Sequence, residues 1–399
     1  MTPFTAPLID SPNLAFESGV LSAEAALTSA MDRAIDCECS GSAVDLLRRS
    51  LVEARRACSH PDEWRRLVER RVRTHAALHL AHEDPFIERC YSKPRGYAGD
   101  AVMLDFIYRH EANRALVERA SSRGRALLAI TSTTPTPGPR AVRNRCRLLA
   151  EEVDALCFRN PGAEVLSVAC GHLREAGHSY AIRDRSFRRV VALDKDQESL
   201  AVVRSDYGPL GVETEEGSVK TIIARGRQLG RFDFVFAAGL YDYLDNKVGA
   251  RLLQAMFELL KPGGRVWIGN FLPDIPDVCY MEALMDWWLI YRTPEEMRSL
   301  AAALPAQQVA GLRVFTETEN NLVFLEVQKH VWQPAVNRAG RCSIRHSIGL
   351  VASLAFAGRR SHPRGPHRSG RGGRRPAASS AVSPWPAFRK RSTAPIPNA

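Results

Sequence analysis

The chain has 399 residues, with a hydrophobic fraction of 45% and a charged fraction of 25%, values typical of a soluble globular protein of one or two domains. No apolar run approaches the roughly 20 residues that a membrane span requires. The sequence up to Ser18 contains acids and no basic segment, so a signal peptide is not expected. The nine cysteines are scattered without a CxxC pair, which is typical of reduced thiols and predicts a cytoplasmic location.

The net charge of +11 belongs to the C-terminal part of the sequence. Residues 331–399 contain thirteen Lys or Arg and no Asp or Glu, and subtracting these thirteen charges leaves −2 for residues 1–330. Nucleic-acid-binding enzymes usually carry positive charge on the folded domain, so nucleic acid is not expected as a partner except weakly through this tail. Because the segment is rich in Arg, Gly, Pro and Ser, we expect residues 331–399 to be a disordered basic tail, either a dispensable extension or the product of a shifted reading frame.

The N-terminal third of the chain predicts helices and no strand. After a loose leader of about 20 residues, apolar side chains recur at intervals of three and four from Ser42, which is placed as an N-cap. Residues 1–135 are therefore expected to form a helical domain. Within this domain we expect helices at residues 42–58, 62–80 and 100–120. A loop at 131–140 and a further helix at 141–156 are expected to follow.

After Pro161-Gly162 the pattern changes to short apolar runs that alternate with longer amphipathic stretches. Most intervening segments are long enough for a crossover helix, so the sheet should be largely parallel, with an antiparallel pair at its end. Seven such strands predict an α/β domain over residues 136–330, with a doubly wound, mostly parallel sheet of the Rossmann-like methyltransferase kind. The expected strands are Glu164–Ala169, Arg189–Leu193, Gly211–Thr214, Asp233–Ala237, Arg265–Asn270, Leu312–Thr316 and Leu322–Val327.

The turn after the first expected strand has the features of a nucleotide site. At such a turn the backbone N–H groups are open to a ligand, and Gly171 lets the ligand approach where a Cβ would block it. Asp194 ends the next expected strand, where a carboxylate can accept hydrogen bonds from both ribose hydroxyls. Ala169 and Leu173 stand where richer loops carry glycine, so an ordinary strand–helix turn is the alternative interpretation.

Three later segments make the pattern more specific. They are KPRGYAGDAVMLDFIY at 93–108, AAGLYDYL at 237–244 and GNFLPDIPDVCYMEALMDWWLIYRTPEEM at 269–297. In addition, LLKPGGRVWIGNF at 259–271 predicts a helix that Pro-Gly-Gly ends and that a strand follows directly. Together they resemble the class I S-adenosylmethionine-dependent methyltransferases. More narrowly, they resemble bacterial proteins named for making hydroxy-fatty-acid methyl ester signals of the extracellular-factor type. The resemblance covers about residues 75–330.

This resemblance implies S-adenosylmethionine as cofactor and a small-molecule acceptor, with the carboxylate of a hydroxy fatty acid as the candidate. The implied cofactor residues are Ala169, Cys170 and Gly171 for the methionine end, Asp194 for the ribose, Ser218 and Val219 for the adenine, and Ala238 and Gly239 beside the sulfonium. The basic tail departs from the family pattern, as do Ala169 and Leu173 in the glycine turn.

Tyrosine and arginine side chains are the candidates for contact with the acceptor. A carboxylate acceptor is ionised at pH 7 and needs no general base, whereas a hydroxyl or amine acceptor can require one. Arginine can hold an anionic group by paired hydrogen bonds. The alternative interpretation is a structural salt bridge for each arginine and a position in the core for each tyrosine. The candidates are Tyr241 and Tyr97 to orient the acceptor, and Arg95, Tyr243, Tyr291 and Arg292 to bind it.

Two further patterns have competing interpretations. The apolar and aromatic segment Tyr280–Arg292 is typical of a core stripe, and it would also suit the roof of an acyl-binding pocket. His75, His79 and His82 share one helical face at a spacing that can bind zinc, but nothing else in the chain completes such a site, so no metal is expected.

Two other classes of function stay open at this point. An NAD(P)-dependent oxidoreductase would share the glycine turn and Asp194, although a GxGxxG sequence is missing and LKPGG does not favour that class. A non-catalytic RNA-binding protein could act through the Arg/Gly-rich tail. The sequence does not indicate an oligomeric state.

Overall fold

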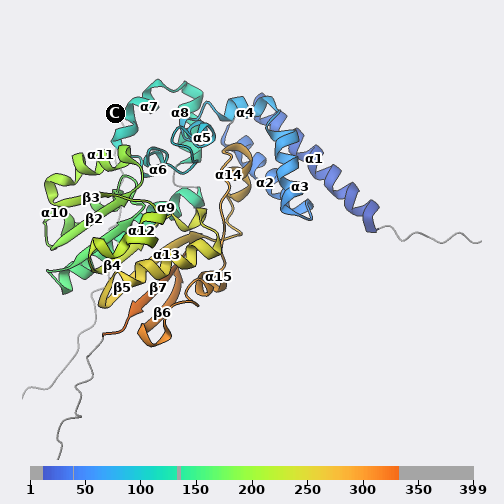
Figure 1. Ribbon diagram of the computed structural model, residues 1–399. Coiled ribbons are helices and arrows are strands. Elements are labelled where there is room, and N and C mark those ends of the chain that lie inside the picture. Colours follow the sequence, from blue (N-terminus) through green and yellow to red (C-terminus); the bar gives the residue numbers. More distant parts are fainter. Residues whose placement is uncertain (1–11, 39, 133–135, 332–399) are drawn as a thin grey trace, which may run out of the picture. The chain divides into compact units, whose positions relative to one another are not determined.

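The computed structural model describes residues 12–38, 40–132 and 136–331 (Figure 1). Residues Met1–Ala335 form one compact unit, which contains both the helical N-terminal part and the sheet. The expected basic tail lies outside the described residues apart from Val331. The boundary predicted near residue 135 stays a prediction, since both sides of it belong to this one unit.

The N-terminal part is helical, as predicted, but its helices are shorter and more numerous than expected. A left-handed residue, Arg109 with φ +53°, ends the helix expected to continue to residue 120. A π-helical turn at Val68–Val72 and the N-cap His75 divide the helix expected over residues 62–80. The helices are α1 Pro12–Asp36, α2 Gly41–Ala57, α3 Pro61–Leu67, α4 Ala76–Ala81, α5 Pro85–Ser92, α6 Ala101–Tyr108, α7 Arg114–Arg119, α8 Ser122–Thr131 and α9 Pro137–Arg159.

Three boundaries differ from the sequence prediction for local reasons. Helix α1 begins at Pro12, so the second half of the expected loose leader is helical. Ser40 rather than Ser42 precedes α2, because Gly41 is already helical. Helix α9 begins at Pro137, inside the expected loop, since proline is well suited to the first turn of a helix, where its missing N–H is not needed.

The sheet has the predicted fold. Its strand order is β3-β2-β1-β4-β5-β7-β6; strands β1 to β5 pair in parallel, and β7 runs antiparallel between β5 and β6. Each of the seven expected strands is present. Their bounds are β1 Glu164–Val168, β2 Arg189–Asp194, β3 Val212–Glu216, β4 Phe232–Ala237, β5 Leu260–Phe271, β6 Val309–Thr316 and β7 Leu322–Lys329.

Strand β5 begins five residues earlier than predicted, because it includes the LKPGG segment. Leu260 pairs with Phe232 and Arg265 pairs with Phe234, so the register shifts between these two pairs. The Pro-Gly-Gly segment therefore forms an irregularity within the strand rather than a gap between helix and strand. A bulge of this kind is where glycine is expected in a strand.

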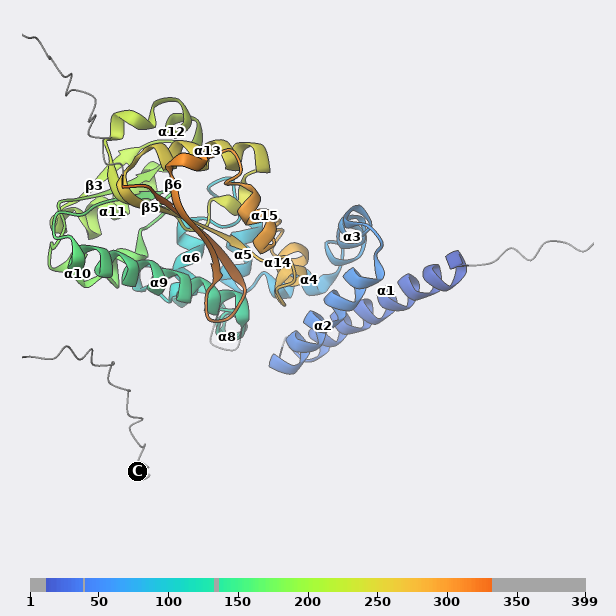
Figure 2. The same ribbon diagram turned by 90° about the horizontal axis from the view of Figure 1, so that it is seen from below.

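Helices cover both faces of the sheet (Figures 1 and 2). On one face α9, α10 (Tyr180–Arg183) and α11 (Gln197–Asp206) pack in a core that continues into the N-terminal helices. On the other face the core is formed with α12 (Val219–Arg225), α13 (Asn246–Glu258) and α15 (Pro294–Ser299). The N-terminal helices therefore share one core with the first face of the sheet.

The aromatic segment Tyr280–Arg292 connects the sheet to these helices. It begins within α14 (Val278–Leu284), which contacts α2 and whose residues are all buried. The indole Nε1 of Trp64 donates a hydrogen bond of 2.8 Å to Glu282, and Arg73 and Lys93 both form ion pairs with Asp286. The segment is thus mainly core, and its polar residues hold the helical part against the sheet.

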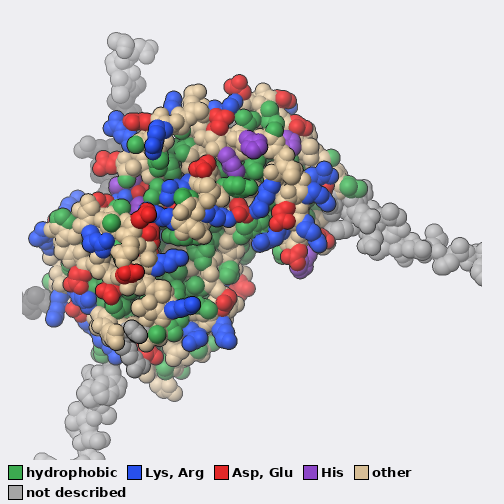
Figure 3. Space-filling model, turned by 45° about the horizontal axis from the view of Figure 1, so that its top comes forward, with side chains coloured by type: hydrophobic (Ala, Val, Ile, Leu, Met, Phe, Trp, Pro, Cys, Tyr) green, Lys and Arg blue, Asp and Glu red, His purple; other side chains and the backbone are tan. Residues whose placement is uncertain are grey.

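The surface of the described unit carries both signs of charge. On the face in Figure 3, basic and acidic side chains are interspersed rather than gathered into one basic stripe. None of the helices among the described residues is long and apolar enough to cross a membrane.

Candidate active site

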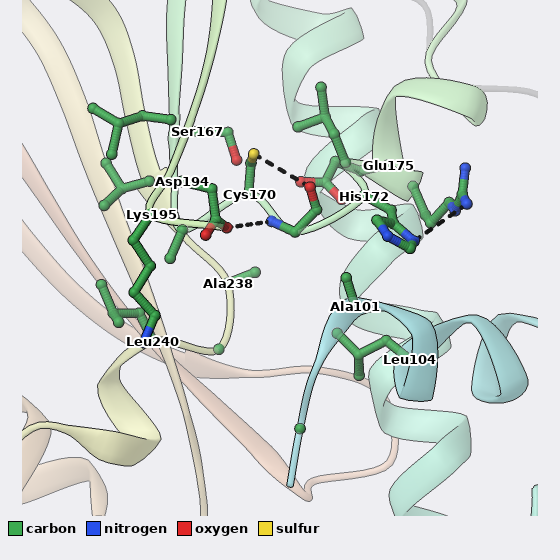
Figure 4. Close-up of a pocket in the computed structure, with 18 of the residues that line it drawn as sticks. Ala101, Leu104, Ser167, Cys170, His172, Glu175, Asp194, Lys195, Ala238 and Leu240 are labelled. Carbon is green, nitrogen blue, oxygen red and sulfur yellow. Dashed lines mark hydrogen bonds between the residues drawn. The ribbon is translucent and has the colours of Figure 1, made fainter. Parts of the chain in front are cut away.

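A cavity of about 270 Å³ opens at the carboxyl edge of the sheet (Figure 4). Its walls come from the ends of β1, β2 and β4, from the turn after β3, and from α6 and α9. The volume lies near the lower end of the range for small-molecule pockets, about 300–1,000 Å³. The crevice predicted to hold a nucleoside is therefore open rather than filled by side chains of the protein.

The turn after β1 has the backbone shape of a ligand-binding loop. Ala169, Gly171 and Leu173 have φ values of +53°, +53° and +50°, so every second residue is left-handed. This conformation costs L-residues about 1–2 kcal/mol each, and such strain is typically found at functional loops. At Gly171 a Cβ would also lie 3.2 Å from the Cβ of Ala101, so glycine suits both the conformation and the close contact with α6.

Asp194 lies at the end of β2 and faces this turn. One carboxylate oxygen accepts a hydrogen bond of 2.8 Å from the backbone N–H of Gly171, and the other accepts one of 3.0 Å from Asp196 (Figure 4). A carboxylate has about four acceptor positions, so each oxygen keeps capacity for a further donor such as a ribose hydroxyl. These bonds fix the orientation of the carboxylate, and its contact with a ribose stays a prediction.

The remaining predicted cofactor residues line the same cavity. Ser218 is the N-cap of α12, and its hydroxyl accepts a hydrogen bond from the Thr221 N–H, as expected for the turn between a strand and a helix. Because the carboxyl ends of parallel strands meet at one edge, the structure brings all eight predicted residues together. They are Ala169, Cys170, Gly171, Asp194, Ser218, Val219, Ala238 and Gly239.

Two of the predicted tyrosines, Tyr97 and Tyr243, also line the cavity. Their rings meet edge to face, with 6.3 Å between centroids, and the Tyr243 hydroxyl accepts a hydrogen bond of 2.8 Å from the indole of Trp287. The ammonium group of Lys195 lies 5.2 Å from the Tyr97 ring centroid. Burial raises the pKa of both tyrosines above the ordinary value, so both hydroxyls remain neutral donors at physiological pH.

The two predicted arginines do not line the cavity. Arg95 forms ion pairs with Asp196 and Glu198. Arg292 is 1% exposed and donates to the backbone carbonyls of Tyr241 and Leu244 and to two asparagine side chains. Most of their donors are bonded within the protein, although the buried Nε of Arg95 has no hydrogen-bond partner among the described residues. The contact of either arginine with an anionic acceptor stays a prediction.

Tyr241 and Tyr291 also lie outside the cavity lining. Tyr241 is fully buried between the sheet and α13, and its hydroxyl donates to the carbonyl oxygen of Gly249 over 3.2 Å. Tyr291 lies near Glu282 and Arg55, on the side of α14. Tyr241 lies in the core and the half-buried Tyr291 packs against core residues, so neither faces the cavity and their roles toward the acceptor stay predictions.

The helical part contributes cavity residues that the sequence prediction missed. Arg145, on α9, donates a hydrogen bond of 3.2 Å from its guanidinium to the carbonyl oxygen of Ala238 and is also hydrogen-bonded to Tyr108. A Cβ at Gly239 would lie 3.0 Å from the same guanidinium nitrogen, so the glycine makes room for Arg145. Nothing in the local sequence around Arg145 signals this position, because it depends on how α9 packs on the sheet.

His172 belongs to a buried polar cluster beside the cavity. Its Nδ1 lies 2.8 Å from the carboxylate of Asp105, which also accepts two hydrogen bonds from Arg174. Burial acts to raise the pKa of Asp105, but the bonds from Arg174 and His172 hold it below its usual range. An ionised carboxylate only accepts, so Nδ1 donates, while the buried Nε2 of His172 has no hydrogen-bond partner among the described residues.

Glu175 lies on the same side of the cavity (Figure 4). Its side chain is buried, and burial raises the pKa of the carboxyl group to about 7, against the opposing effects of its own backbone N–H and of Arg145 and Arg174. A buried carboxyl group with such a pKa is sensitive to any cation that binds nearby. Glu175 is the second residue of the short 3-10 helix Arg174–Gly177 that follows the glycine turn, and no local sequence motif indicated it.

Two of the three histidines of the zinc spacing, His75 and His82, have separate partners. His75 caps α4 and lies 3.2 Å from Asp32, whereas His82 contacts the carbonyl oxygen of Leu284 and the ring of Tyr91. In the described part of the chain, no three His, Cys, Asp or Glu side chains come together in a group able to hold a metal ion.

The strand order and this site define a class I methyltransferase fold with its cofactor crevice at the carboxyl edge. Residues 165–264 match the family model described as a methyltransferase domain, a match that runs from β1 into β5. The predicted class, an S-adenosylmethionine-dependent methyltransferase, and its predicted cofactor are thereby confirmed. The described residues fit that cofactor, because Asp194 retains free acceptor positions and the left-handed turn leaves backbone open to it.

Solved structures with similar folds cover between about half and two thirds of the chain. A possible exported protein from Bordetella parapertussis is 16% identical, with a TM-score of 0.43, covering 63% of this chain and 96% of that one. Magnesium protoporphyrin IX methyltransferase from Synechocystis PCC 6803, with bound SAH, is 12% identical, with a TM-score of 0.37 and coverages of 54% and 99%. A TehB-like SAM-dependent methyltransferase from Corynebacterium glutamicum is 18% identical, with a TM-score of 0.33 and coverages of 54% and 100%. No curated protein matches the sequence significantly.

Proposed function

We propose that this protein transfers a methyl group from S-adenosylmethionine to the carboxylate of a small molecule, a hydroxy fatty acid, and so makes a methyl ester. The observation that carries the proposal is the open crevice in which Gly171 and Asp194 are joined by a hydrogen bond, within the stretch that matches a methyltransferase domain. The fatty-acid class of the acceptor is supported by the resemblance of three long sequence segments to bacterial proteins named for that product.

The cofactor residues keep the roles expected from the sequence. In this proposal the turn Ala169-Cys170-Gly171 holds the methionine end, Asp194 accepts from the ribose, Ser218 and Val219 contact the adenine, and Ala238-Gly239 passes beside the sulfonium. The cofactor supplies a methyl group on a sulfonium that is already a good leaving group. The protein therefore acts mainly by alignment of the acceptor with that methyl group, and such positioning contributes up to about 7–11 kcal/mol.

Tyr97 and Tyr243 orient the acceptor in this proposal. Their neutral hydroxyls can donate hydrogen bonds to a carboxylate, and the nearby ammonium group of Lys195 favours an anion at the same place. The attacking carboxylate oxygen forms the new bond to carbon as the carbon–sulfur bond breaks, so no proton needs to be removed. Beyond Trp287, a second cavity with an almost wholly apolar lining, of about 20 Å³ as it stands, lies where the acyl chain would begin.

Product identification tests the acceptor. The purified protein is incubated with labelled S-adenosylmethionine and a set of hydroxy fatty acids of different lengths, in parallel with a cell extract, and the labelled products are identified by mass spectrometry. We expect the label as a methyl ester that mild alkali releases as methanol. Label in an alkali-stable O-methyl or N-methyl product would show a different acceptor while leaving the cofactor assignment intact.

The replacement Asp194→Ala tests the ribose contact. Hydrogen bonds to a charged acceptor contribute about 1.5–3 kcal/mol, so the variant should bind S-adenosylhomocysteine about 10- to 100-fold more weakly in calorimetry, with the fold retained. Glu216→Ala is the matched control, because Glu216 pairs with Asp194 across β2 and β3 yet is exposed and outside the cavity. Unchanged affinity in the Asp194 variant would remove this residue from the site.

Thermal stability separates the methyltransferase from a dehydrogenase. A ligand that binds only the folded state raises the melting temperature, by an amount that grows with the logarithm of the ligand concentration divided by its Kd. We expect S-adenosylmethionine and S-adenosylhomocysteine to stabilise the protein and NADH to leave it unchanged. Stabilisation by NADH alone would support the oxidoreductase instead.

A further inference from the structure

A second cavity, of about 710 Å³, lies between α2 and the segment that joins β5 to α14. Helices α2 and α14 are in contact and lie beside each other in Figure 1. The cavity shares no lining residue with the candidate active site, and its volume is within the range for small-molecule pockets, about 300–1,000 Å³. We call it the α2 groove, and it is a separate place for a ligand.

Arginine side chains of α2 make one wall of the α2 groove basic. Among the described residues, only one of these four arginines has an ion-pair partner, namely Arg55, whose Nε lies 3.6 Å from Glu282. Three acids also line the groove, and none of them pairs with these arginines in the described part of the chain. The groove therefore keeps an excess of positive charge that the protein does not neutralise by contact. The arginines are Arg48, Arg49, Arg55 and Arg56, and the acids are Glu53, Asp274 and Asp277.

Arg48 presents a complete hydrogen-bonding edge without a partner. Its Nε and Nη2 are buried, and neither has a hydrogen-bond partner among the described residues. The guanidinium lies over the ring of Tyr280, 4.8 Å from its centroid, and this contact orients its plane. In Arg89 the same two nitrogens donate to both oxygens of Asp100, over 2.9 and 2.7 Å. The edge of Arg48 is therefore suited to an oxyanion, because two parallel N–H donors match a carboxylate or a phosphate.

The rest of the wall indicates that the ligand also has an apolar part. Val52 of α2, Trp64 of α3 and Ile275 line the groove beside the arginines. Arg48 also lines the small apolar cavity next to Trp287, so it lies at the inner end of the groove. Ligand pockets commonly combine apolar walls with a few polar groups that fix the orientation of the ligand. An organic anion fits this combination better than a bare inorganic ion.

We propose that the α2 groove binds a small organic anion whose carboxylate or phosphate head group pairs with Arg48. The head group accepts hydrogen bonds from the Nε and Nη2 of Arg48, and the apolar part of the ligand packs against Val52 and Ile275. Arg49 and Arg56 are exposed, and they attract the anion to the groove. This site goes beyond the proposed function and does not depend on it, since the groove and the crevice of the cofactor have no lining residue in common.

Four probes separate the head group of the ligand from its apolar part. Octyl phosphate and octanoate carry both parts, whereas inorganic phosphate lacks the chain and 1-octanol lacks the charge. In calorimetry on the full chain, we expect octyl phosphate or octanoate to bind at least about tenfold more tightly than inorganic phosphate and 1-octanol. Tighter binding of octyl phosphate would identify the natural head group as a phosphate, and tighter binding of octanoate would identify it as a carboxylate.

A cysteine of the α2 groove reports where the probe binds. Cys58 lines the groove and is partly exposed, whereas Cys37 is partly exposed and lies outside it. The tighter amphiphile, at about ten times its Kd, should slow the alkylation of Cys58 by iodoacetamide about tenfold, because about a tenth of the protein stays free. Mass spectrometry of the peptides measures both rates, and the rate at Cys37 should not change. This readout separates the groove from the active-site cavity.

Arginine variants test the head-group contact. Arg48→Met keeps a side chain that can pack on Tyr280 and removes the donors, so it should bind the tighter amphiphile about 10- to 100-fold more weakly. Arg66→Met is the matched control, because Arg66 is exposed on α3 and outside the groove. If Arg48→Met does not fold, Arg49→Glu reverses an exposed charge of the groove and should weaken the same probe.

Three results would overturn the site. The first is an absence of binding by both octyl phosphate and octanoate, and the second is binding that leaves the alkylation of Cys58 unchanged. The third is wild-type affinity in the folded Arg48→Met variant or, where that variant does not fold, in Arg49→Glu.

Discussion

Glu175 lines the cavity in which the cofactor is proposed to bind, so it can link cofactor binding to a measurable proton. Its pKa is about 7 in the protein without ligand, because burial disfavours the ionised form more than Arg145 and Arg174 favour it. Burial also raises the pKa of the neighbouring Cys146 and Tyr108, so both of these groups remain neutral at this pH. An ammonium group placed against Glu175 would favour the carboxylate and lower its pKa, so the bound proton would leave.

We therefore predict proton release when S-adenosylhomocysteine binds near pH 6.5. The apparent binding enthalpy, measured in buffers of different ionisation enthalpy, should show release of a substantial part of one proton for wild type and almost none for Glu175→Gln. 5′-Methylthioadenosine, which lacks the ammonium group, should release none from either protein. Equal release from wild type and the glutamine variant would mean that the proton comes from another group.

The structure brings the predicted cofactor residues together in one cavity, whereas only Tyr97 and Tyr243 of the predicted acceptor residues line it. Gly171 and Asp194 follow strands, and parallel strands bring their carboxyl ends to one edge, so their meeting follows from the order of elements. Arg292 could not be judged in the same way, because the paired donors that suit an anionic acceptor also suit the backbone carbonyls that it binds here. Arg145 could not be found at all, since its place depends on the packing of a helix that precedes the sheet.

At the scale of elements, strands were predicted better than helix boundaries. Most strands contain a short apolar run, so their positions follow from composition, whereas the helices of the N-terminal part end at single residues. Lys93 and Arg109 end α5 and α6 in the left-handed conformation, which sequence propensity would not assign to lysine or arginine. The extension of β5 through Pro-Gly-Gly was missed for a related reason, because pairing with β4 overrides the usual tendency of these residues to end an element.

The irregular start of β5 gives a prediction about Gly264. A Cβ at this position would lie 3.0–3.1 Å from the backbone oxygens of Lys261, Phe232 and Asp233, none of which can move independently of the sheet. Overpacking of this kind typically costs about 1–3 kcal/mol, so Gly264→Ala should lower the free energy of unfolding in urea by that amount. Gly311→Ala is the control, since nothing lies within 4 Å of its Cβ position on β6. Equal stability of the two variants would mean that the strand start adjusts freely.

At the scale of the whole unit, the helical part and the sheet depend on one another. They share a continuous core on the α9 face, and the segment around α14 is anchored to the N-terminal helices through Glu282 and Asp286. Part of the cavity wall also comes from α6 and α9. A change of charge deep in the helical part should therefore alter the stability of the whole unit rather than that of one segment.

Asp84 allows this to be tested through the pH dependence of stability. It is fully buried at the N-cap of α5, where it accepts hydrogen bonds from Thr131 and the Phe86 N–H, and burial raises its pKa to about 7. Burial also raises the pKa of Glu175 and of Asp242 to about 7. The folded state thus binds more protons than the unfolded state between about pH 4 and pH 7, so the stability that these groups contribute at low pH is lost as the pH rises through 7.

The free energy of unfolding should consequently fall between pH 5 and pH 7.5, by up to about 1.4 kcal/mol per pH unit for each of these carboxyl groups. Asp84→Asn keeps the N-cap acceptor and cannot ionise, so its stability should fall less steeply over this range. Urea unfolding at pH 5.5, 6.5 and 7.5 measures both slopes, with Asp245→Asn, at the exposed N-cap of α13, as the control that retains the wild-type slope. Parallel slopes for wild type and Asp84→Asn would show that the buried aspartate does not take up a proton on folding.

Because the helical part and the sheet share one core, probes placed in each should report the same single unfolding transition in both proteins.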